Sequence, residues 1–389
     1  MLRVSSIQSE VHDPPVAIAK NWIAGRSFDA SPPLIDVSQA VPGIAPAAAL
    51  RAHIAEVAQG NDASRYSPAL GLTATREAIA RSFTDQNLSP DNVMVTAGCN
   101  QAFCLAIGSL CDAGDEVIVP TPWYFNHEMW LKACGVQAVP LPVRADEAML
   151  PNLAACKALV TAHTRAIVLV TPNNPCGVEY PASLIHAFFE FAQSIGVALI
   201  LDETYKDFRA STERAHALFD DPSWPDTLLH LFSFSKVFSL AGYRVGSLTA
   251  APHVLREAVK LADCQTISAP TLSQHAVAFA LANLDDWVAE RRLEMLARVN
   301  AFRSAMVAAP QFEVVSSGAY FAYVRHPFVS EPAATVAKRL ADDFNVLCIP
   351  GSSFGPEQDR FLRLAFGNIS DAAMDELAHR LAIAASKHH

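Results

Sequence analysis

A lysine and an arginine follow one apolar run of the sequence at a spacing that suits chemistry beside a bound anion. Lys236 lies in the segment Ser233-Phe234-Ser235-Lys236, directly after the run Leu229–Phe232, and Arg244 stands eight residues further on. A lysine among apolar residues loses its charge easily when it is desolvated, and it then becomes a nucleophilic amine. Arginine can bind an anion through two parallel hydrogen bonds. The segment therefore indicates amine chemistry next to an anion site.

Polar side chains also follow three other apolar runs. A glycine at a strand-to-helix turn lets backbone N–H groups converge on an anion, although many such turns contain glycine for geometry alone. An acid at the end of a buried strand is costly to leave unpaired, so it needs a cationic or hydrogen-bonded partner. The residues are Gly98, Cys99 and Asn100 after Val93–Thr96, Asn174 after Ala166–Val170, and Asp202 and Tyr205 after Val197–Leu201.

Two features near these runs have a plainer interpretation when each is taken alone. The consecutive aromatics Trp123 and Tyr124, which follow the run Glu116–Val119, could stack on a flat heteroaromatic ring, but core packing is favoured on these residues alone. Asn174 precedes Pro175, so it could belong to an ordinary turn or point its amide into a site.

The apolar runs predict the elements that bring these side chains together. Between about residues 90 and 250, short apolar runs alternate with longer helical stretches, and most of the runs are apolar throughout. Strands buried on both faces have this pattern, so we predict an α/β fold with a mostly parallel open sheet covered by helices. In such sheets, binding sites form at the carboxyl ends of the strands. The candidate side chains therefore fall on one edge of one sheet.

One cofactor requires this whole set of groups. The edge would carry an anion cradle, a stacking ring, an amide, an acid, a phenol, a lysine and an arginine. Pyridoxal phosphate presents a phosphate, a flat ring, a phenolate oxygen, a ring nitrogen and an aldehyde. The sequence therefore predicts a pyridoxal-phosphate site.

The pattern of predicted helices and strands changes after about residue 275. A long helical pattern runs from Ser273 to Val307, and short strands separated by helical segments follow it, which indicates a smaller α+β unit. The first 46 residues hold six prolines, and we expect them to be extended and draped over another part of the chain. We predict a large cofactor-binding domain over 47–275 and a small unit made of 1–46 and 276–389.

The composition bounds the class of protein. Hydrophobic residues make up 51% and charged residues 17% of the 389 residues, as in a well-folded globular chain. The formal charge of −10, without a basic cluster, disfavours nucleic acid and anionic membranes as partners. The eight cysteines are scattered without a Cys-x-x-Cys pair, so no metal site is expected. The polar start of the chain and the lack of a long apolar run lead us to expect a cytoplasmic protein without a membrane span.

The pattern resembles the class I/II aminotransferases, the fold-type-I pyridoxal-phosphate enzymes. The resemblance extends from Ser38-Gln39 to Arg363, and its pieces occur in the family order. Ser233-x-Ser235-Lys236 with Arg244 eight residues later is the most specific piece. The others are Tyr66-Ser67-Pro68 with Gly71, Thr96-Ala97-Gly98, Pro122-Trp123-Tyr124, Asn174-Pro175-x-Gly177, Asp202-x-x-Tyr205 and Gly318-Ala319-Tyr320-Phe321.

The resemblance implies an aspartate-aminotransferase-like fold and a role for each cofactor-binding residue. Lys236 would form the internal Schiff base and then move protons during the reaction. Asp202 would pair with the ring nitrogen, with His127 behind it, and Tyr205 and Asn174 would bind the phenolate oxygen. Tyr124 would stack on the ring, with Trp123 as the alternative. The phosphate would be held by Ser233, Ser235, Arg244 and the backbone of Gly98, Cys99 and Asn100.

The resemblance also implies how substrate and a second subunit are bound. Arg363 would bind the substrate α-carboxylate, and Asn174 would lie beside it. Tyr66 would reach the phosphate of the neighbouring subunit, which implies a homodimer with shared sites. Ala40 stands where many relatives have glycine, so its side chain could narrow the substrate pocket. Cys99 stands where relatives have threonine, serine or alanine, and a small buried residue is favoured there over a reactive thiol.

Three functions fit the sequence to different degrees. The first is an aminotransferase that moves an amino group from a neutral or aromatic amino acid to a 2-oxo acid. The second keeps the cofactor but is a lyase, cyclase or synthase of specialised amino-acid metabolism. The third, a ligand-sensing regulator, is disfavoured because the chain lacks a basic helix for DNA. A nicotinamide enzyme is disfavoured because no Gly-x-Gly-x-x-Gly follows a strand.

The prediction of neutral amino donors rests on the lack of a further cation for the distal carboxylate of a dicarboxylate substrate. Asn100 is uncharged, and the segment 264–271, which reaches the partner's pocket in relatives, holds no arginine or lysine. Trp22 suits contact with an apolar or aromatic substrate side chain. Lys20 and Arg26 lie near Trp22 in sequence, so a dicarboxylate substrate remains an alternative.

Overall fold

The structure is a computed structural model that describes residues 2–28, 32–83 and 87–387. Its seven-stranded sheet has the order β2-β8-β7-β6-β5-β3-β4. Every neighbouring pair is parallel except those of β8, which runs antiparallel to β2 and β7. The predicted mostly parallel open sheet is therefore confirmed. The strands are β2 (Val93–Thr96), β3 (Glu116–Thr121), β4 (Gln137–Pro142), β5 (Thr164–Val170), β6 (Ala198–Asp202), β7 (Leu228–Ser233) and β8 (Gly246–Thr249).

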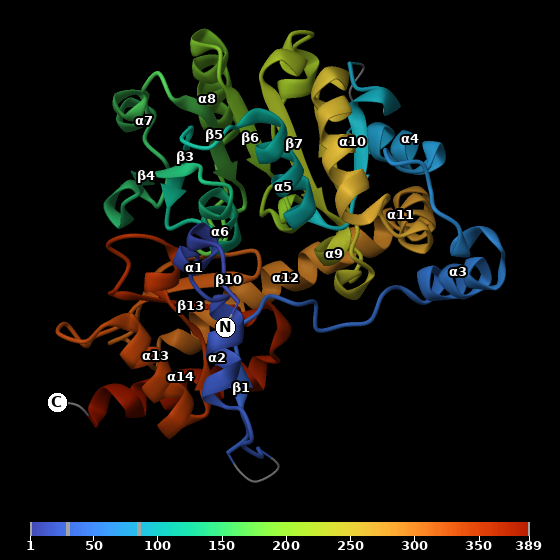
Figure 1. The fold of residues 1–389 in the computed structure, drawn as a ribbon. Helices are drawn as coiled ribbons and strands as arrows, with labels where there is room; N and C mark the ends of the chain where they lie inside the picture. Colours follow the sequence, from blue (N-terminus) through green and yellow to red (C-terminus); the bar gives the residue numbers. More distant parts are fainter. Residues whose placement is uncertain (1, 29–31, 84–86, 388–389) are drawn as a thin grey trace.

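Helices cover both faces of this sheet (Figure 1). Strand β5 shows why its sequence is apolar throughout, because successive side chains of a strand point to opposite faces. Ile167 and Leu169 pack in one core, and Val168 and Val170 pack in the other. The first core is covered by α3 (Ala48–Gln59), α4 (Thr73–Ser82), α7 (Leu153–Leu159), α8 (Ala182–Ile195) and α11 (Thr271–Asn283), and the second by α5 (Cys99–Leu110), α6 (Phe125–Ala133) and α10 (Pro252–Thr266).

Strand β4 was not predicted from the sequence. It pairs only with β3 at the edge of the sheet, and it contains Pro140 and Pro142. A proline cannot donate a ladder hydrogen bond, so it is tolerated in an edge strand and argues against a strand when the sequence is considered alone.

A second sheet lies below the first in Figure 1, and its four strands have the order β12-β13-β10-β9. Its helices pack with it around a separate core that includes Phe302, Leu340 and Leu377. The elements are α12 (Asp285–Met306), β9 (Glu313–Gly318), β10 (Phe321–Arg325), α13 (Ala333–Phe344), β12 (Ile349–Pro350), β13 (Phe361–Leu364) and α14 (Asp371–Ser386).

The helical pattern that we predicted as continuous from Ser273 to Val307 is two helices. Helix α11 ends at Asn283 and α12 begins at Asp285. Leu284 between them is buried in the core under the large sheet, and its backbone leaves the helical region at φ −120° and ψ 24°. Asp285 and Asp286 lie in the first turn of α12, where negative charge favours a helix start.

The N-terminal segment is partly helical, so the prediction of an extended segment was wrong there. It forms α1 (Ser6–Glu10) and α2 (Pro15–Trp22), and Pro15 is the first residue of α2. The fixed φ angle of proline suits that position, and its missing N–H would be unpaired there in any case. Beyond α2, β1 (Ile35–Asp36) pairs in parallel with β11 (Val346–Leu347). No helix in the described part of the chain is long and apolar enough to cross a membrane.

Candidate active site

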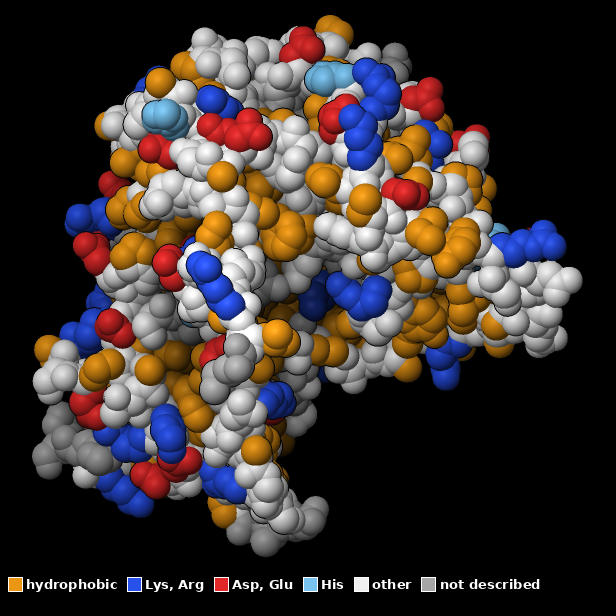
Figure 2. Space-filling model, in the orientation of Figure 1, with side chains coloured by type: hydrophobic (Ala, Val, Ile, Leu, Met, Phe, Trp, Pro, Cys, Tyr) orange, Lys and Arg blue, Asp and Glu red, His pale blue; other side chains and the backbone are white. Residues whose placement is uncertain are grey.

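One cavity of about 480 Å³ lies at the carboxyl ends of β5, β6 and β7. Figure 2 shows a hollow between the upper and lower parts of the molecule with Lys and Arg side chains deep inside it. Most of the side chains that the sequence singled out line this cavity. They are Ala40, Cys99, Asn100, Tyr124, Asn174, Asp202, Tyr205, Ser233, Ser235, Lys236, Arg244 and Arg363.

Lys236 lies on the single turn of helix α9 (Phe234–Val237), directly after β7. Its Nζ atom donates a hydrogen bond to the carbonyl oxygen of Ala40. Burial, reinforced by the charges of Arg244 and Arg363, lowers the pKa of Lys236 to about 8. Lys236 therefore loses its proton far more easily than an ordinary lysine, as a nucleophilic lysine requires.

Asp202 ends β6 and is almost completely buried. Its Oδ1 atom accepts the Thr204 N–H at 2.9 Å, and its Oδ2 atom lies 3.4 Å from Nε2 of His127. Burial opposes the charge, but the contacts with His127 and Thr204 outweigh it and hold the pKa of Asp202 below its usual value. The cavity wall therefore contains a carboxylate. His127 is fixed by stacking on Phe103, with the ring centroids 4.0 Å apart.

The start of helix α5 forms an anion cradle with Arg244. Gly98 precedes the helix with φ +88°, and a Cβ atom there would lie 2.4 Å from Nη2 of Arg244. Glycine is therefore needed both for the backbone conformation and for the approach of the guanidinium. Ser233 and Ser235 are buried beside it, and Nη1 of Arg244 lies 3.5 Å from Oγ of Ser235. The helix start, the hydroxyls and the guanidinium together suit a phosphate.

Asn174 and Tyr205 offer hydrogen-bond donors to the cavity. The Asn174 Oδ1 atom accepts a bond from Nη1 of Arg363 at 3.2 Å, which leaves its amide N–H groups available. Tyr205 is buried, its hydroxyl has no hydrogen-bond partner among the described residues, and burial raises its pKa well above the usual value. The phenol is therefore protonated and can donate. Two buried donors of this kind suit an anionic oxygen on a ligand.

Arg363 is a fully buried cation on β13 that has no carboxylate partner in the described part of the chain. It donates to Asn174 and to the carbonyl oxygen of Ser38, and its Nε atom is buried without a partner there. The rings of Phe125, Phe321 and Phe354 surround the guanidinium at 5.2–5.9 Å. Burial lowers the pKa of Arg363 to about 10. A desolvated cation in this position favours binding of an anion from outside the chain.

Of the aromatic pair Trp123 and Tyr124, Tyr124 lines the cavity and Trp123 does not. Trp123 packs partly buried beside the core between the sheet and α5. The Tyr124 hydroxyl lies 3.4 Å from Oδ1 of Asn100, and burial raises the pKa of Tyr124 to about 12. Of the two stacking residues left open by the sequence, the geometry favours Tyr124.

Cys99 also lines the cavity. Burial and the nearby Asp202 raise the pKa of its thiol well above the usual value, which favours the interpretation of Cys99 as a small inert residue.

Two predicted site residues lie outside this cavity. Trp22 packs partly buried against the core around the small sheet and against the cluster that includes Phe354. Tyr66 is 76% exposed on the surface of the chain. The two cations near Trp22 are engaged elsewhere, since Lys20 pairs with Asp36 and Arg26 donates to Asn345.

Several cavity residues were not found from the sequence. Pro14 and Val16 come from the N-terminal segment, Gln39 and Val41 flank Ala40, and Asn126 comes from the first turn of α6. The sequence held no signal for the first two, because their place depends on how the N-terminal segment crosses the molecule. Asn126 stands beside the aromatic pair 123–124, and its place after a strand was the available signal.

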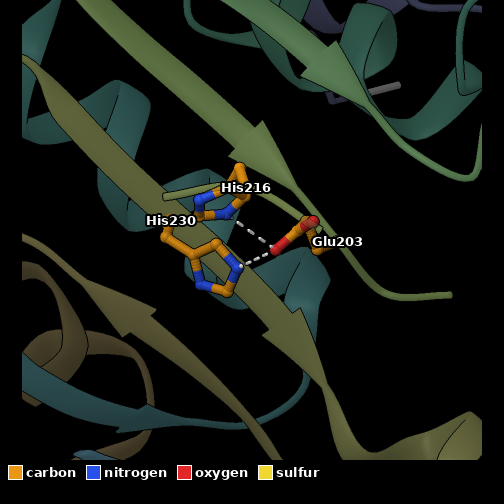
Figure 3. Close-up of side chains that lie close together, drawn as sticks. All are labelled: Glu203, His216 and His230. Atoms are coloured by element: carbon orange, nitrogen blue, oxygen red, sulfur yellow. Dashed lines mark hydrogen bonds and ion pairs between the residues drawn. The ribbon is translucent and has the colours of Figure 1, made fainter. Parts of the chain in front are cut away.

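A buried group of Glu203, His216 and His230 lies outside this cavity (Figure 3). Glu203 Oε2 lies 2.9 Å from Nε2 of His230 and 3.2 Å from Nε2 of His216. Nδ1 of His216 accepts the backbone N–H of Leu218, so the proton of this ring is on Nε2, which cannot then bind a metal. Burial opposes ionisation of Glu203, but the two imidazoles outweigh it and lower its pKa far below the usual value. We interpret the group as a hydrogen-bond network around a carboxylate.

Comparison with known proteins gives the family. The profile of the family described as "Aminotransferase class I and II" matches residues 33–381. The chain belongs to the class I and II aminotransferases. An aromatic aminotransferase of Arabidopsis thaliana is 28% identical over 82% of this chain and 81% of its own length. An arginine–pyruvate transaminase of Pseudomonas aeruginosa is 28% identical over 88% of this chain and 87% of its own length.

Solved structures of the family share the fold of this aminotransferase. The aspartate aminotransferase of Thermus thermophilus with maleate has a TM-score of 0.90 at 23% identity and covers 98% of this chain and 100% of its own. An aromatic aminotransferase of Pyrococcus horikoshii has a TM-score of 0.85 at 22% identity, covering 96% and 99% of the two chains. The aspartate-aminotransferase-like fold predicted from the sequence is confirmed. As a member of this family, the chain is a pyridoxal-phosphate-dependent aminotransferase.

Proposed function

We propose that this aminotransferase moves the amino group of a neutral amino acid, aliphatic or aromatic, to a 2-oxo acid. The observation that carries the proposal is the set of cations in the cavity wall. Lys236, Arg244 and Arg363 are the only basic residues of the described chain that line it. If these three serve the cofactor aldehyde, the phosphate and the α-carboxylate, no cation of this chain remains for a second carboxylate. An unpaired carboxylate in a closed site costs several kcal/mol.

The residues present fit pyridoxal phosphate. The cradle of Gly98, Ser235 and Arg244 would hold the phosphate, and Tyr124 would cover the ring. Asp202 would face the ring nitrogen, because it is the buried carboxylate of the wall. Asn174 and Tyr205 would donate to the phenolate oxygen. When bound, this cofactor supplies an electron sink for the charge that develops on the substrate α-carbon.

Lys236 and Arg363 would act on the substrate itself. Lys236 would hold the cofactor through its amine, and as a free amine it would move a proton to and from the substrate α-carbon. Its lowered pKa near 8 suits this task, since a general base works best when its pKa is close to the working pH. Arg363 would orient the α-carboxylate through paired hydrogen bonds, so that the bond to the α-proton faces Lys236.

We also propose the division of the chain into a large domain and a small unit that includes the N-terminal segment, and assembly as a homodimer. The predicted bounds, 47–275 for the large domain and 1–46 with 276–389 for the small unit, divide α11, which packs with Leu284 in the core of the large sheet, so we extend the large domain to Leu284. The parallel pairing of β1 with β11 supports placing the N-terminal segment with the small unit. The exposed Tyr66 supports the dimer. If a second subunit packed over Tyr66, the Tyr66 hydroxyl could bind the phosphate in the site of that second subunit. Sedimentation of the purified chain tests the dimer.

A lyase, cyclase or synthase with the same cofactor, which the sequence left open, has no observation of the structure in its favour. Aromatic, aspartate and arginine–pyruvate specificities all occur in the names of relatives at 24–28% identity, so the names do not choose a substrate. Half-reactions with single amino acids decide between the reactions. A transaminase converts the bound cofactor stoichiometrically to its amine form and releases the 2-oxo acid. If no amino acid in a full panel does this, the proposed reaction is wrong.

A further inference from the structure

We propose that Asn126 forms hydrogen bonds with the distal end of the substrate side chain. It would thereby select amino donors that end in a neutral hydrogen-bonding group, such as the carboxamide of glutamine. This inference rests on the proposed function and narrows its substrate class. It makes Asn126 a specificity-determining residue, together with the N-terminal segment that packs on the same helix.

Part of the cavity wall is not used by the cofactor or by the α-carboxylate. Arg363 and Asn174 mark the carboxylate end, and the cradle at Gly98 marks the phosphate end. The lining residues beyond these two ends include Pro14, Val16, Gln39, Val41 and Asn126. A substrate side chain that extends from the α-carbon must meet some of these residues. None of the five is charged.

The N-terminal segment is held over this part of the cavity by contacts on both of its sides. His12 Nε2 lies 3.0 Å from Oε2 of Glu128, and Gln8 donates to the carbonyl oxygen of Ala133. Both partners belong to α6 or its end, the helix that carries Asn126. Lys20 pairs with Asp36 on the other side. Pro14 and Val16 lie between these anchors in the sequence, so the segment contributes an apolar part to the wall of the cavity that Asn126 also lines.

Asn126 itself has an unused hydrogen-bonding capacity. It is half-buried, and its carboxamide has no hydrogen-bond partner among the described residues. The oxygens of two other carboxamides in the lining are engaged, since Asn174 accepts from Arg363 and Asn100 accepts from Tyr124, whereas the more exposed Gln39 makes no hydrogen bond with the described residues. A side-chain amide offers both donors and an acceptor. A ligand that removes water from it without replacing the hydrogen bonds loses affinity.

The chemistry of the best ligand follows from this wall. Val16 and Pro14 suit methylene groups, and Asn126 suits a group that can accept and donate at once. A carboxamide meets both requirements. A hydrocarbon ring fills the apolar part but leaves the amide unpaired, and a carboxylate finds no cation of this chain. We expect glutamine to exceed methionine, which has a side chain of similar length, by roughly tenfold in kcat/KM.

The test compares glutamine with methionine as amino donors for the wild-type holoenzyme and for Asn126→Leu. Leucine keeps the approximate volume and removes the hydrogen bonds, so the ratio of the two kcat/KM values should fall about tenfold or reverse. Asn126→Asp retains the shape and should also lower the glutamine preference, because it lacks a donor. Asn300→Leu is the matched control, because Asn300 is exposed on α12 and lines a different cavity. Its ratio should equal that of the wild type.

Binding without turnover provides a second measurement. α-Methylglutamine and α-methylmethionine lack the α-proton, and their dissociation constants can be followed by the absorbance of the cofactor. The same ratio should appear in binding and should fall in Asn126→Leu. If the wild type transaminates amino acids but prefers methionine or phenylalanine to glutamine, or if both Asn126 variants keep the glutamine preference, the inference is wrong and the proposed function stands. If no amino acid is transaminated, the proposed function fails first.

Discussion

Arg363 on β13 of the small sheet donates to Oδ1 of Asn174, in the loop after β5 of the large sheet, at 3.2 Å. The bond joins the two halves of the molecule at the cavity. It also decides which way the amide of Asn174 faces, because arginine has no acceptor and must meet the oxygen. The amide nitrogen is therefore turned away from the guanidinium and is available as a donor in the cavity wall.

Replacing Asn174 tests this orientation. Asn174→Asp places a carboxylate beside Arg363 that competes with the substrate carboxylate and removes the amide donor. We expect KM for amino donors to rise on the order of 10- to 100-fold, with a lower kcat, because charge-assisted bonds contribute about 1.5–3 kcal/mol. Asn174→Ala removes the amide without adding charge and should raise KM less. Equal KM values for the two variants would rule out competition for Arg363.

A second prediction concerns the shape of the guanidinium. Arg363→Lys keeps the charge but cannot bind a carboxylate through two parallel bonds. We expect KM to rise and kcat to fall together, since both binding and orientation of the substrate change. Steady-state kinetics with one amino donor measure this. An unchanged kcat/KM would mean that Arg363 serves only to join the two sheets.

The carboxylate of Asp202 should matter for proton removal more than for cofactor binding. Asp202→Asn keeps the shape and removes the charge that would hold a proton on the ring nitrogen. Amino acids should still bind, but removal of the α-proton should slow by several orders of magnitude because stabilisation of the developing charge is lost. Stopped-flow absorbance of the half-reaction separates binding from this step. A variant with nearly normal turnover would show that Asp202 is not the partner of the ring nitrogen.

The network of Glu203 and His230 predicts how stability depends on pH. Burial lowers the pKa of His230 from the ordinary 6.5, so the unfolded state binds more protons just below that pH. The stability that comes from the neutral imidazole is therefore present above about pH 6.5 and is lost as the pH falls. Glu203, with its lowered pKa, adds a similar loss only in stronger acid.

His230→Leu measures the first part. It should lower the midpoint of thermal unfolding at pH 7.5, because Glu203 loses a donor, at a cost of about 1–3 kcal/mol. The variant should also show a smaller decrease of the unfolding midpoint than the wild type when the pH falls from 7.5 to 5.5. His186→Leu is the control, since the side chain of His186 is 53% exposed and should leave the slope unchanged. A slope that His230→Leu does not change would exclude this titration.

The sequence predicted the central part of the site because strand ends carry a strong signal. Asp202, Lys236 and Asn174 follow uniformly apolar runs, and parallel strands bring such ends together. The side chains that meet the substrate beyond its α-carbon were less accessible. Pro14, Val16 and Asn126 come together only through tertiary contacts, such as that of His12 with Glu128 across 116 residues of sequence. Local sequence patterns do not predict such a long-range contact.

The errors in the fold have the same origin. Pro15 was read as a signal for extended chain, yet it begins a helix, because the fixed φ angle of proline suits both structures. The break at Leu284 was missed because its neighbours continue a helical period on both sides. Trp22 was predicted to meet the substrate because of its residue type, and it packs against two hydrophobic clusters and does not line the cavity. Burial in one core or another is not visible from residue type.

The identity of the lysine that carries the cofactor tests the account most directly. Borohydride reduction of the holoenzyme makes the attachment permanent, and peptide mapping by mass spectrometry then locates it. We predict that the label lies on Lys236, and that Lys236→Ala gives no covalent label and loses turnover by several orders of magnitude. A label on Lys206 or Lys260, or a fully active Lys236→Ala variant, would contradict the assignment of the entire site.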